Sequence, residues 1–326
     1  MQRRTFLGTA ALTALGTQLP SLAWARQYPS RPINYIVAYT PGSANDILVR
    51  LIAPKLDEFL KSTVVVINKP GAGGSVGMAA LAQAPADGYN LGLGSNATMA
   101  INQAMFGNLS YDPIADFYGV AKIATSPNVV VVPAKSRIGT IAELIALLPK
   151  QPLLYSSPGN GTTQHLAGAM LKNRTSGVCE HVPYKGPAEA IAALISGDQV
   201  DYGFASLPSV LAQVRAGQLR ALAVTPAQPT EFLPDVPTLA SAGLPDFEKT
   251  DLWFGMVVRK QTPHPIVQAL HDATLQALLD PTVQASLAKG GYVPAGQEPL
   301  GQFEQFLTDQ ARFWAELVNQ SGAKIG

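Results

Sequence analysis

The chain has little cysteine, little histidine and almost no excess charge, and each shortage excludes a class of protein. Cys179 is the only cysteine among 326 residues, so an internal disulfide and a cluster built on several thiolates are both excluded. The four histidines are scattered, and His264 and His271 do not form the i, i+4 pair of a helical metal site. Basic residues number 23 against 22 acidic ones, which argues against nucleic acid as a partner. We therefore expect no metal and no cofactor.

Long apolar runs are also scarce, and the run near the start of the chain is short and broken. It covers residues 7–22 and includes glycines and a proline, so it is too short to cross a bilayer as a helix. Arg3 and Arg4 precede it in a pattern that resembles a twin-arginine export signal. Ala23-Trp24-Ala25 then supplies the small-x-small pattern that signal peptidase requires. We predict that residues 1–25 are a removed signal peptide and that the mature protein is periplasmic.

The rest of the chain alternates apolar, strand-like runs with segments of helical spacing. Its length predicts two domains, and an apolar fraction of 47% is enough to fill their cores. Continuous apolar strands separated by helices are typical of parallel sheets covered on both faces. The expected strands are 34–39, 63–67, 90–94, 129–132, 153–155, 179–182, 200–204, 219–224 and 253–258. The expected helices are 44–60, with a kink at Pro54, and 75–83, 97–105, 141–148, 162–171, 187–195, 209–215, 265–279, 282–289 and 300–318.

Several loops at the ends of these expected strands are rich in glycine, serine, threonine and asparagine. In open parallel sheets, ligands bind beyond the carboxyl ends of the strands, where loops lead into helices. Such loops offer unpaired amide N–H groups, hydroxyls and the positive end of a helix, which suit a carboxylate, although ordinary turns and helix caps look the same. The five loops are 40–46, 70–75, 94–98, 156–163 and 184–187. The first and fourth come from different halves, and their convergence would make a site.

Other motif matches lead to weaker interpretations. Gly71, Gly73 and Gly77 resemble a dinucleotide fingerprint, but Val76 stands in the place of its third glycine. Residues 73–77 fit a nucleophile elbow with Ser75 as the nucleophile, which would make the protein a periplasmic serine hydrolase. An elbow requires a strand that runs straight into the serine, whereas Lys69-Pro70-Gly71 breaks the chain there.

Ordered motifs run along the whole mature chain. They are Tyr28-Pro29-Ser30-Arg31-Pro32-Ile33, Thr40-Pro41-Gly42, Asn68-Lys69-Pro70-Gly71-Ala72-Gly73-Gly74, Pro85-Ala86-Asp87-Gly88-Tyr89, His181-Val182-Pro183-Tyr184-Lys185-Gly186 and Leu233-Pro234-Asp235-Val236-Pro237-Thr238. Together they resemble the Bug/TctC family, the extracytoplasmic solute receptors of tripartite tricarboxylate transporters. The resemblance implies a two-lobed α/β periplasmic-binding-protein fold of type II-like topology, with a mostly parallel sheet flanked by helices in each lobe and a ligand cleft between the lobes. The expected limits are 26–127 plus 225–326 for lobe 1 and 128–224 for lobe 2.

The resemblance also implies capture of a small carboxylate-bearing metabolite, without catalysis, by a monomer that delivers it to membrane permease subunits. A receptor that senses the ligand for a signalling partner is the alternative. In the family, the first β–α loop and the loop that opens the second-lobe helix hold the carboxylate. The predicted ligand-binding residues are therefore Gly42, Ser43, Ala44, Asn45, Asp46, Ser95, Asn96, Gly159, Asn160, Gly161, Thr162, Thr163 and His165. Among them, Asp46 is expected to fix its loop or cap its helix, because two bare anions repel each other.

Overall fold

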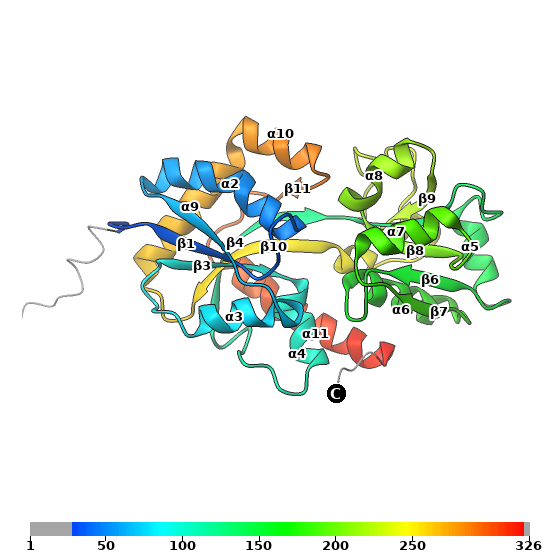
Figure 1. Ribbon diagram of the computed structural model, residues 1–326, viewed down its shortest axis with the longest axis horizontal. Coiled ribbons are helices and arrows are strands. Elements are labelled where there is room, and N and C mark those ends of the chain that lie inside the picture. Colours follow the sequence, from blue (N-terminus) through cyan, green and yellow to red (C-terminus); the bar gives the residue numbers. More distant parts are fainter. Residues whose placement is uncertain (1–27, 323–326) are drawn as a thin grey trace, which may run out of the picture.

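Two β-sheets organise the chain in the computed structural model, which describes residues 28–322 (Figure 1). The sheet of lobe 1 contains β1 (Ile33–Val37), β2 (Val64–Asn68), β3 (Asn90–Ser95), β4 (Phe117–Ser126), β10 (Leu252–Arg259) and β11 (Val293–Pro294). The sheet of lobe 2 contains β5 (Asn128–Pro133), β6 (Leu154–Ser157), β7 (Glu180–Pro183), β8 (Tyr202–Ser206) and β9 (Leu219–Val224). The two-lobed fold is thus confirmed, whereas the predicted signal peptide lies outside the described residues.

Most strands of each sheet point the same way, as predicted. The order in lobe 1 is β11-β4-β10-β3-β1-β2, where β1 to β4 share one direction and β10 and β11 oppose it. The order in lobe 2 is β7-β6-β8-β5-β9, where β5 alone runs against its neighbours. The parallel strands bring their carboxyl ends to one edge of each sheet, which is where the glycine-rich loops lie.

Helices cover both faces of each sheet. Those packed with lobe 1 are α2 (Ala44–Leu60), α3 (Ser75–Ala82), α4 (Asn102–Met105), α9 (His264–Leu279), α10 (Pro281–Lys289) and α11 (Gln302–Ser321), with the short turns η1 (Ala72–Gly74) and η2 (Ala97–Ile101). Those of lobe 2 are α5 (Ile141–Leu147), α6 (Thr163–Thr175), α7 (Pro187–Ser196) and α8 (Leu207–Arg215), while η3 (Ala240–Ala242) and η4 (Phe247–Thr250) lie in the passage to β10. Among the described residues, no helix has both the length and the apolar character needed to cross a membrane.

The strand β1 shows why a continuous apolar run folds in this way. Tyr35 and Val37 pack in a cluster with α2 and α9, whereas Ile36 and Ala38 pack in a cluster with α3 and α11 on the opposite face. Because successive side chains of a strand point to opposite faces, a strand covered by helices on both sides needs apolar residues at every position. Figure 1 shows α2, α9 and α10 on one side of this sheet and α3, α4 and α11 on the other.

The two lobes are joined by strands and also share a hydrophobic cluster. β4 passes into β5 with only Pro127 between them, and nothing in the periodic pattern of the sequence predicts β4. The shared cluster contains Met105 of lobe 1, residues of α6 in lobe 2 and Trp314 of α11. Gln310 fixes this arrangement, since its Oε1 accepts hydrogen bonds at 2.8 Å from the indole N–H groups of both Trp253 and Trp314.

The passage from β9 to β10 packs mainly on lobe 2. Phe232 and Leu233 lie in a cluster with Val129 and Val131 of β5, and Leu239 and Phe247 lie in the shared cluster. Helix η4 ends at Thr250, directly before β10. We therefore propose that the second crossing between the lobes falls at Asp251 and that residues 225–250 belong with lobe 2, in place of the limit at residue 225 expected from the sequence.

A buried polar network ties the two crossings together. The backbone N–H of Asn128 donates to Thr225 Oγ1 at 2.8 Å, and Thr225 Oγ1 also bonds to Asp251 Oδ1. The Asn128 side chain donates to the Thr250 carbonyl at 2.8 Å and accepts from Gln164 Nε2 of α6, also at 2.8 Å. Burial raises the pKa of the Asp251 carboxyl to about 8, although its bond to Thr225 acts in the opposite direction. The protonated form of Asp251 is therefore favoured at neutral pH.

This protonated carboxyl predicts a pH-dependent stability. Because the unfolded chain releases the proton near pH 4 and the folded chain holds it to about pH 8, the contribution of Asp251 to stability is fully present below pH 4 and is lost as pH rises through this window. The expected loss is roughly 1.4 kcal/mol per pH unit between pH 5 and 7, relative to Asp251→Asn, whose amide keeps the shape and carries no charge. Urea unfolding of both proteins at several pH values measures the difference. An unchanged difference between pH 5 and 7 would show that Asp251 is ionised in the folded protein.

Candidate functional site

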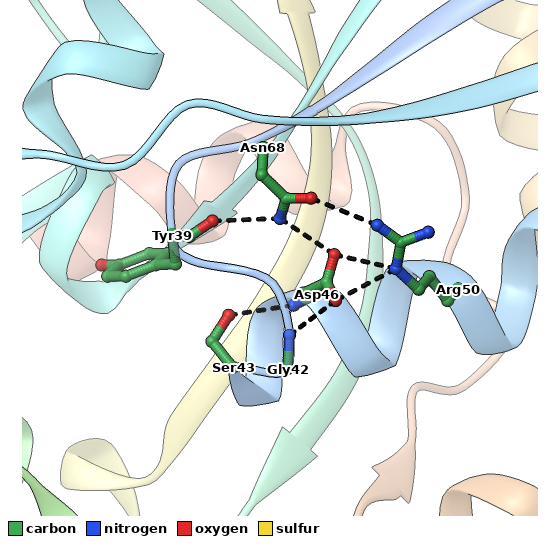
Figure 2. A network of polar contacts seen from close by, with 6 residues as sticks. All are labelled: Tyr39, Gly42, Ser43, Asp46, Arg50 and Asn68. Atoms are coloured by element: carbon green, nitrogen blue, oxygen red, sulfur yellow. Dashed lines mark hydrogen bonds and ion pairs between the residues drawn. The ribbon is translucent and has the colours of Figure 1, made fainter.

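Asp46 holds the first loop of lobe 1 in place (Figure 2). Its carboxylate, only 2% exposed, accepts hydrogen bonds from the Gly42 N–H at 2.9 Å, from Asn68 Nδ2 at 2.9 Å and from Arg50 Nε at 3.0 Å. Its backbone N–H donates to Ser43 Oγ, which is the N-cap of α2. The residue thus joins the loop to its own helix and to the end of β2, instead of presenting its charge to a ligand.

The charges in this part of the site cancel one another. Burial alone would raise the pKa of Asp46, but hydrogen bonds from Arg50, Gly42 and Asn68 outweigh it and hold the pKa below its ordinary value. The guanidinium of Arg50 also donates to Asn68 Oδ1 at 3.2 Å, and Asn68 Nδ2 donates to the Tyr39 carbonyl at 3.0 Å. The positive charge of Arg50 is therefore taken up within the loop. A ligand at this loop would meet neutral donors.

The free donors at this end of lobe 1 are backbone amides. The N–H groups of Ala44 and Asn45, at the start of α2, donate to no acceptor among residues 28–322, as is usual in the first turn of a helix. Together with the positive end of the helix dipole, they favour a bound anion. The Gly42 amide, in contrast, is already used by Asp46. Figure 1 shows that β1 runs toward lobe 2 and that α2 begins on that side.

The third loop, at the end of β3, lies at the crossing between the lobes. The Asn96 side chain is 2% exposed, accepts from the Trp253 N–H at 2.9 Å and donates to the Asp251 carbonyl at 3.0 Å. Ser95 is 6% exposed and its backbone N–H donates to Thr98 Oγ1 at 3.1 Å. The side-chain amide of Asn96 therefore holds β10 against β3. Its contribution to ligand binding stays a prediction.

The loop that opens α6 in lobe 2 is held by its own side chains. Thr162 Oγ1 donates to the Gly159 carbonyl at 2.8 Å and accepts from the His165 N–H at 3.2 Å, which makes Thr162 the N-cap of α6. The Gly161 N–H donates to His165 Nδ1 at 3.1 Å, so this amide is also occupied. The amides of Asn160, Thr163 and Gln164 donate to no described residue, and Thr163 Oγ1 is buried without a partner. These are the groups that a ligand could satisfy.

Gly161 also touches lobe 1. A Cβ atom built on Gly161 would lie 2.1 Å from Met105 Sδ, at the end of α4, and the φ angle of Gly161 is +74°. The loop that leads into α6 is therefore in contact with lobe 1 at Gly161. Tyr39, which follows β1, reaches the same side of lobe 1, since its hydroxyl donates to the Gly73 carbonyl at 3.3 Å. The ligand-binding role of the predicted residues is a proposal supported by this geometry.

Three residues of the network in Figure 2, Tyr39, Arg50 and Asn68, are absent from the predicted set. Asn68 and Arg50 hold Asp46, yet neither stands in a glycine-rich loop. The role of Asn68 could have been inferred from its place at the end of β2. It pairs in register with Val37 at the end of β1, so both residues lie at the same edge of the sheet.

Ser75, the nucleophile of the hydrolase interpretation, accepts a hydrogen bond from Asn102 Nδ2 at 3.2 Å and lines a pocket of about 440 Å³ along α3. Among residues 28–322, no histidine contacts it and no group of three potential metal ligands occurs.

The sequence and the fold resemble those of known proteins. Residues 48–323 match the model of the tripartite tricarboxylate transporter family receptor, TctC. The chain is 33% identical to Protein BugT of Bordetella pertussis over 92% of both chains. It also resembles the structure of Rpa4515 of R. palustris with adipate, at 30% identity and a TM-score of 0.80 over 91% of this chain and all of the other. The structure of MatC from Rhodopseudomonas palustris with bound malate has 26% identity and a TM-score of 0.76, over 89% of this chain and all of the other. The chain belongs to the TctC receptor family, which includes the Bug proteins.

Proposed function

We propose that the protein is a periplasmic receptor that captures a small carboxylate between its lobes and delivers it to the membrane permease subunits of a tripartite tricarboxylate transporter. The observation that carries the proposal is that α2 in lobe 1 and α6 in lobe 2 each begin with backbone amides that donate to no acceptor among residues 28–322. The Arg50 guanidinium beside the start of α2 is paired with Asp46. Such sites select anions through hydrogen bonds and the helix dipole. The adipate and malate named for two relatives support this ligand class.

The receptor is expected to act by closure of its lobes on the ligand. A ligand that contacts both helix starts binds the closed arrangement more tightly than the open one and therefore shifts the population toward it. Export as a monomer through a twin-arginine signal remains part of the same proposal. The family is one of solute receptors, so we assign no reaction to the protein.

Ligand binding should raise the thermal stability. At a ligand concentration of 100 times the dissociation constant, a true ligand adds about 2.7 kcal/mol to the free energy of unfolding. Thermal-shift measurements with a panel of carboxylates, begun with adipate and malate, test this expectation. The matched control is adipamide, which has the length of adipate without its charge and should give no shift. Stabilisation by the diamide equal to that by the acid would contradict the anion site.

A further inference from the structure

Two histidines stack on each other beside the anion loop of lobe 2. His165 lies in the first turn of α6 and His181 lies in β7, and their ring centroids are 3.9 Å apart with an interplanar angle of 15°. Tyr155 of β6 supports both, because its ring lies 5.0 Å from that of His181 and its hydroxyl donates to the His165 carbonyl at 3.2 Å. The pair arises because β7 pairs with β6 in a register that places His181 opposite Tyr155.

Each ring is bonded to the same short loop. The Gly161 N–H donates to His165 Nδ1 at 3.1 Å, and His181 Nε2 lies 2.6 Å from Ser157 Oγ. Ser157 Oγ in turn accepts from the Gly159 N–H at 3.2 Å. Both imidazoles therefore fix the course of residues 157–161, which lead into the free amides at the start of α6.

The contacts define the protonation of His165. A nitrogen that accepts the Gly161 N–H carries no proton, so a neutral His165 ring has its proton on Nε2. Tyr155 packs on His181, and Tyr202 and Cys179 lie beside Tyr155. No carboxylate bonds to either histidine ring among residues 28–322. Burial lowers the pKa of His165 to about 4, and burial followed by the neighbouring His165 lowers that of His181 to about 3. Both rings are neutral at physiological pH.

We propose, on the basis of the function proposed above, that His181 is a positioning residue for anion binding. Its stacked ring and its bond to Ser157 hold His165 as the neutral Nε2–H tautomer, and this tautomer holds the Gly161 loop at the geometry that binds the ligand. His165 Nε2 donates to no described residue, so its proton is available to a carboxylate. His181 acts through His165 and does not itself touch the ligand.

The proposal predicts a change in the pH profile of binding. In His181→Ala, water reaches His165 and its pKa rises toward the ordinary value near 6.5. Affinity for the adipate or malate probe should fall at least about fivefold at pH 7, the effect of one lost positioning contact. It should fall further from pH 7 to pH 5, because a protonated Nδ1 no longer accepts the Gly161 N–H. The wild type should show no histidine-dependent step in this range.

Two further variants separate this role from general stability. His181→Phe keeps an apolar ring on His165, so its affinity should follow the pH profile of the wild type between pH 5 and 7, which includes the titration of the ligand's own carboxyl groups. His271→Gln removes another buried histidine, bonded to the Glu298 carbonyl in lobe 1, and should change stability without changing affinity or its pH profile. A His181→Ala protein with the affinity and the pH profile of the wild type would overturn the proposal. An affinity that rises toward pH 5 would also overturn it, since charge would then outweigh loop geometry.

A measurement without ligand keeps the two proposals distinguishable. Nitrogen-15 NMR of the imidazoles in the ligand-free protein should show His165 as the Nε2–H tautomer in the wild type, with a titration near pH 6 only in His181→Ala. A wild-type His165 with its proton on Nδ1, or with an ordinary pKa, would refute the positioning role. If neither adipate nor any other carboxylate binds, the proposed function fails, and the NMR result still decides whether His181 holds the tautomer.

Discussion

Replacement of Gly161 by valine should destabilise the protein by about 3 kcal/mol or more and reduce affinity for its carboxylate by on the order of a hundredfold. The φ angle of +74° is unfavourable for a β-branched residue, and the new Cβ would meet Met105 Sδ at 2.1 Å and Cε at 2.6 Å. Met105 is 4% exposed and packed in the cluster shared by the lobes, so it cannot move aside without cost. The loop would shift away from His165 and carry the free amides of α6 with it.

Two further variants identify the cause of the expected losses of stability and affinity in Gly161→Val. Gly243→Val has a similar φ angle of +85° and no atom within 4 Å of its Cβ, so it should show only the backbone strain of about 1–2 kcal/mol. Met105→Ala removes the atoms that clash, and the double variant should be less impaired than the sum of the single ones. Urea unfolding and calorimetric titration measure both quantities. Wild-type affinity in Gly161→Val would show that the α6 loop does not bind the anion.

The sequence predicts the local elements well because their determinants are local. The helix expected at 44–60 is observed as Ala44–Leu60, since its apolar spacing and the Ser43 cap are both encoded in adjacent residues. The capping box of α5 is local in the same way, because Thr140 and Glu143 are three residues apart and each side chain bonds to the backbone N–H of the other. α2 continues through Pro54 as one helix, and the kink expected there stays a prediction. The missing N–H at that position is accommodated without ending the helix.

What the sequence does not predict depends on contacts between distant segments. β4 lies between β10 and β11, which come more than a hundred residues later, so its pairing is invisible in a local pattern. The contact of Gly161 with Met105 joins two lobes. For the same reason, sequence reasoning treats the Gly42 and Gly161 amides as ligand donors, whereas Asp46 and His165 occupy them. The glycines shape the loops, and the amides that follow them are left free.

Replacement of Asp46 by alanine should destabilise the protein by about 3 kcal/mol and weaken carboxylate binding at least tenfold. The Gly42 N–H, Asn68 Nδ2 and Arg50 Nε would each lose the acceptor that Asp46 supplies. The bond from Asn68 Nδ2 to the Tyr39 carbonyl would then be the remaining side-chain link between this loop and β2. The N-cap contact survives in the variant, because the backbone N–H of residue 46 still reaches Ser43 Oγ. The start of α2 should therefore persist as a helix, while the loop before it moves.

The matched control is Asp57→Ala in the same helix. Asp57 Oδ1 also accepts a hydrogen bond from a backbone N–H, that of Val64, but at the far end of α2. Its loss should therefore lower stability and leave affinity unchanged.

The variant Asp46→Asn distinguishes two effects of Asp46 on affinity, which are repulsion of the bound anion and positioning of the loop. If the charge of Asp46 mainly repelled the bound anion, its neutralisation would raise affinity, and that result in calorimetric titration would contradict a positioning role. We expect affinity to fall, because the amide cannot accept at both oxygen positions and the Arg50 charge is left without its partner.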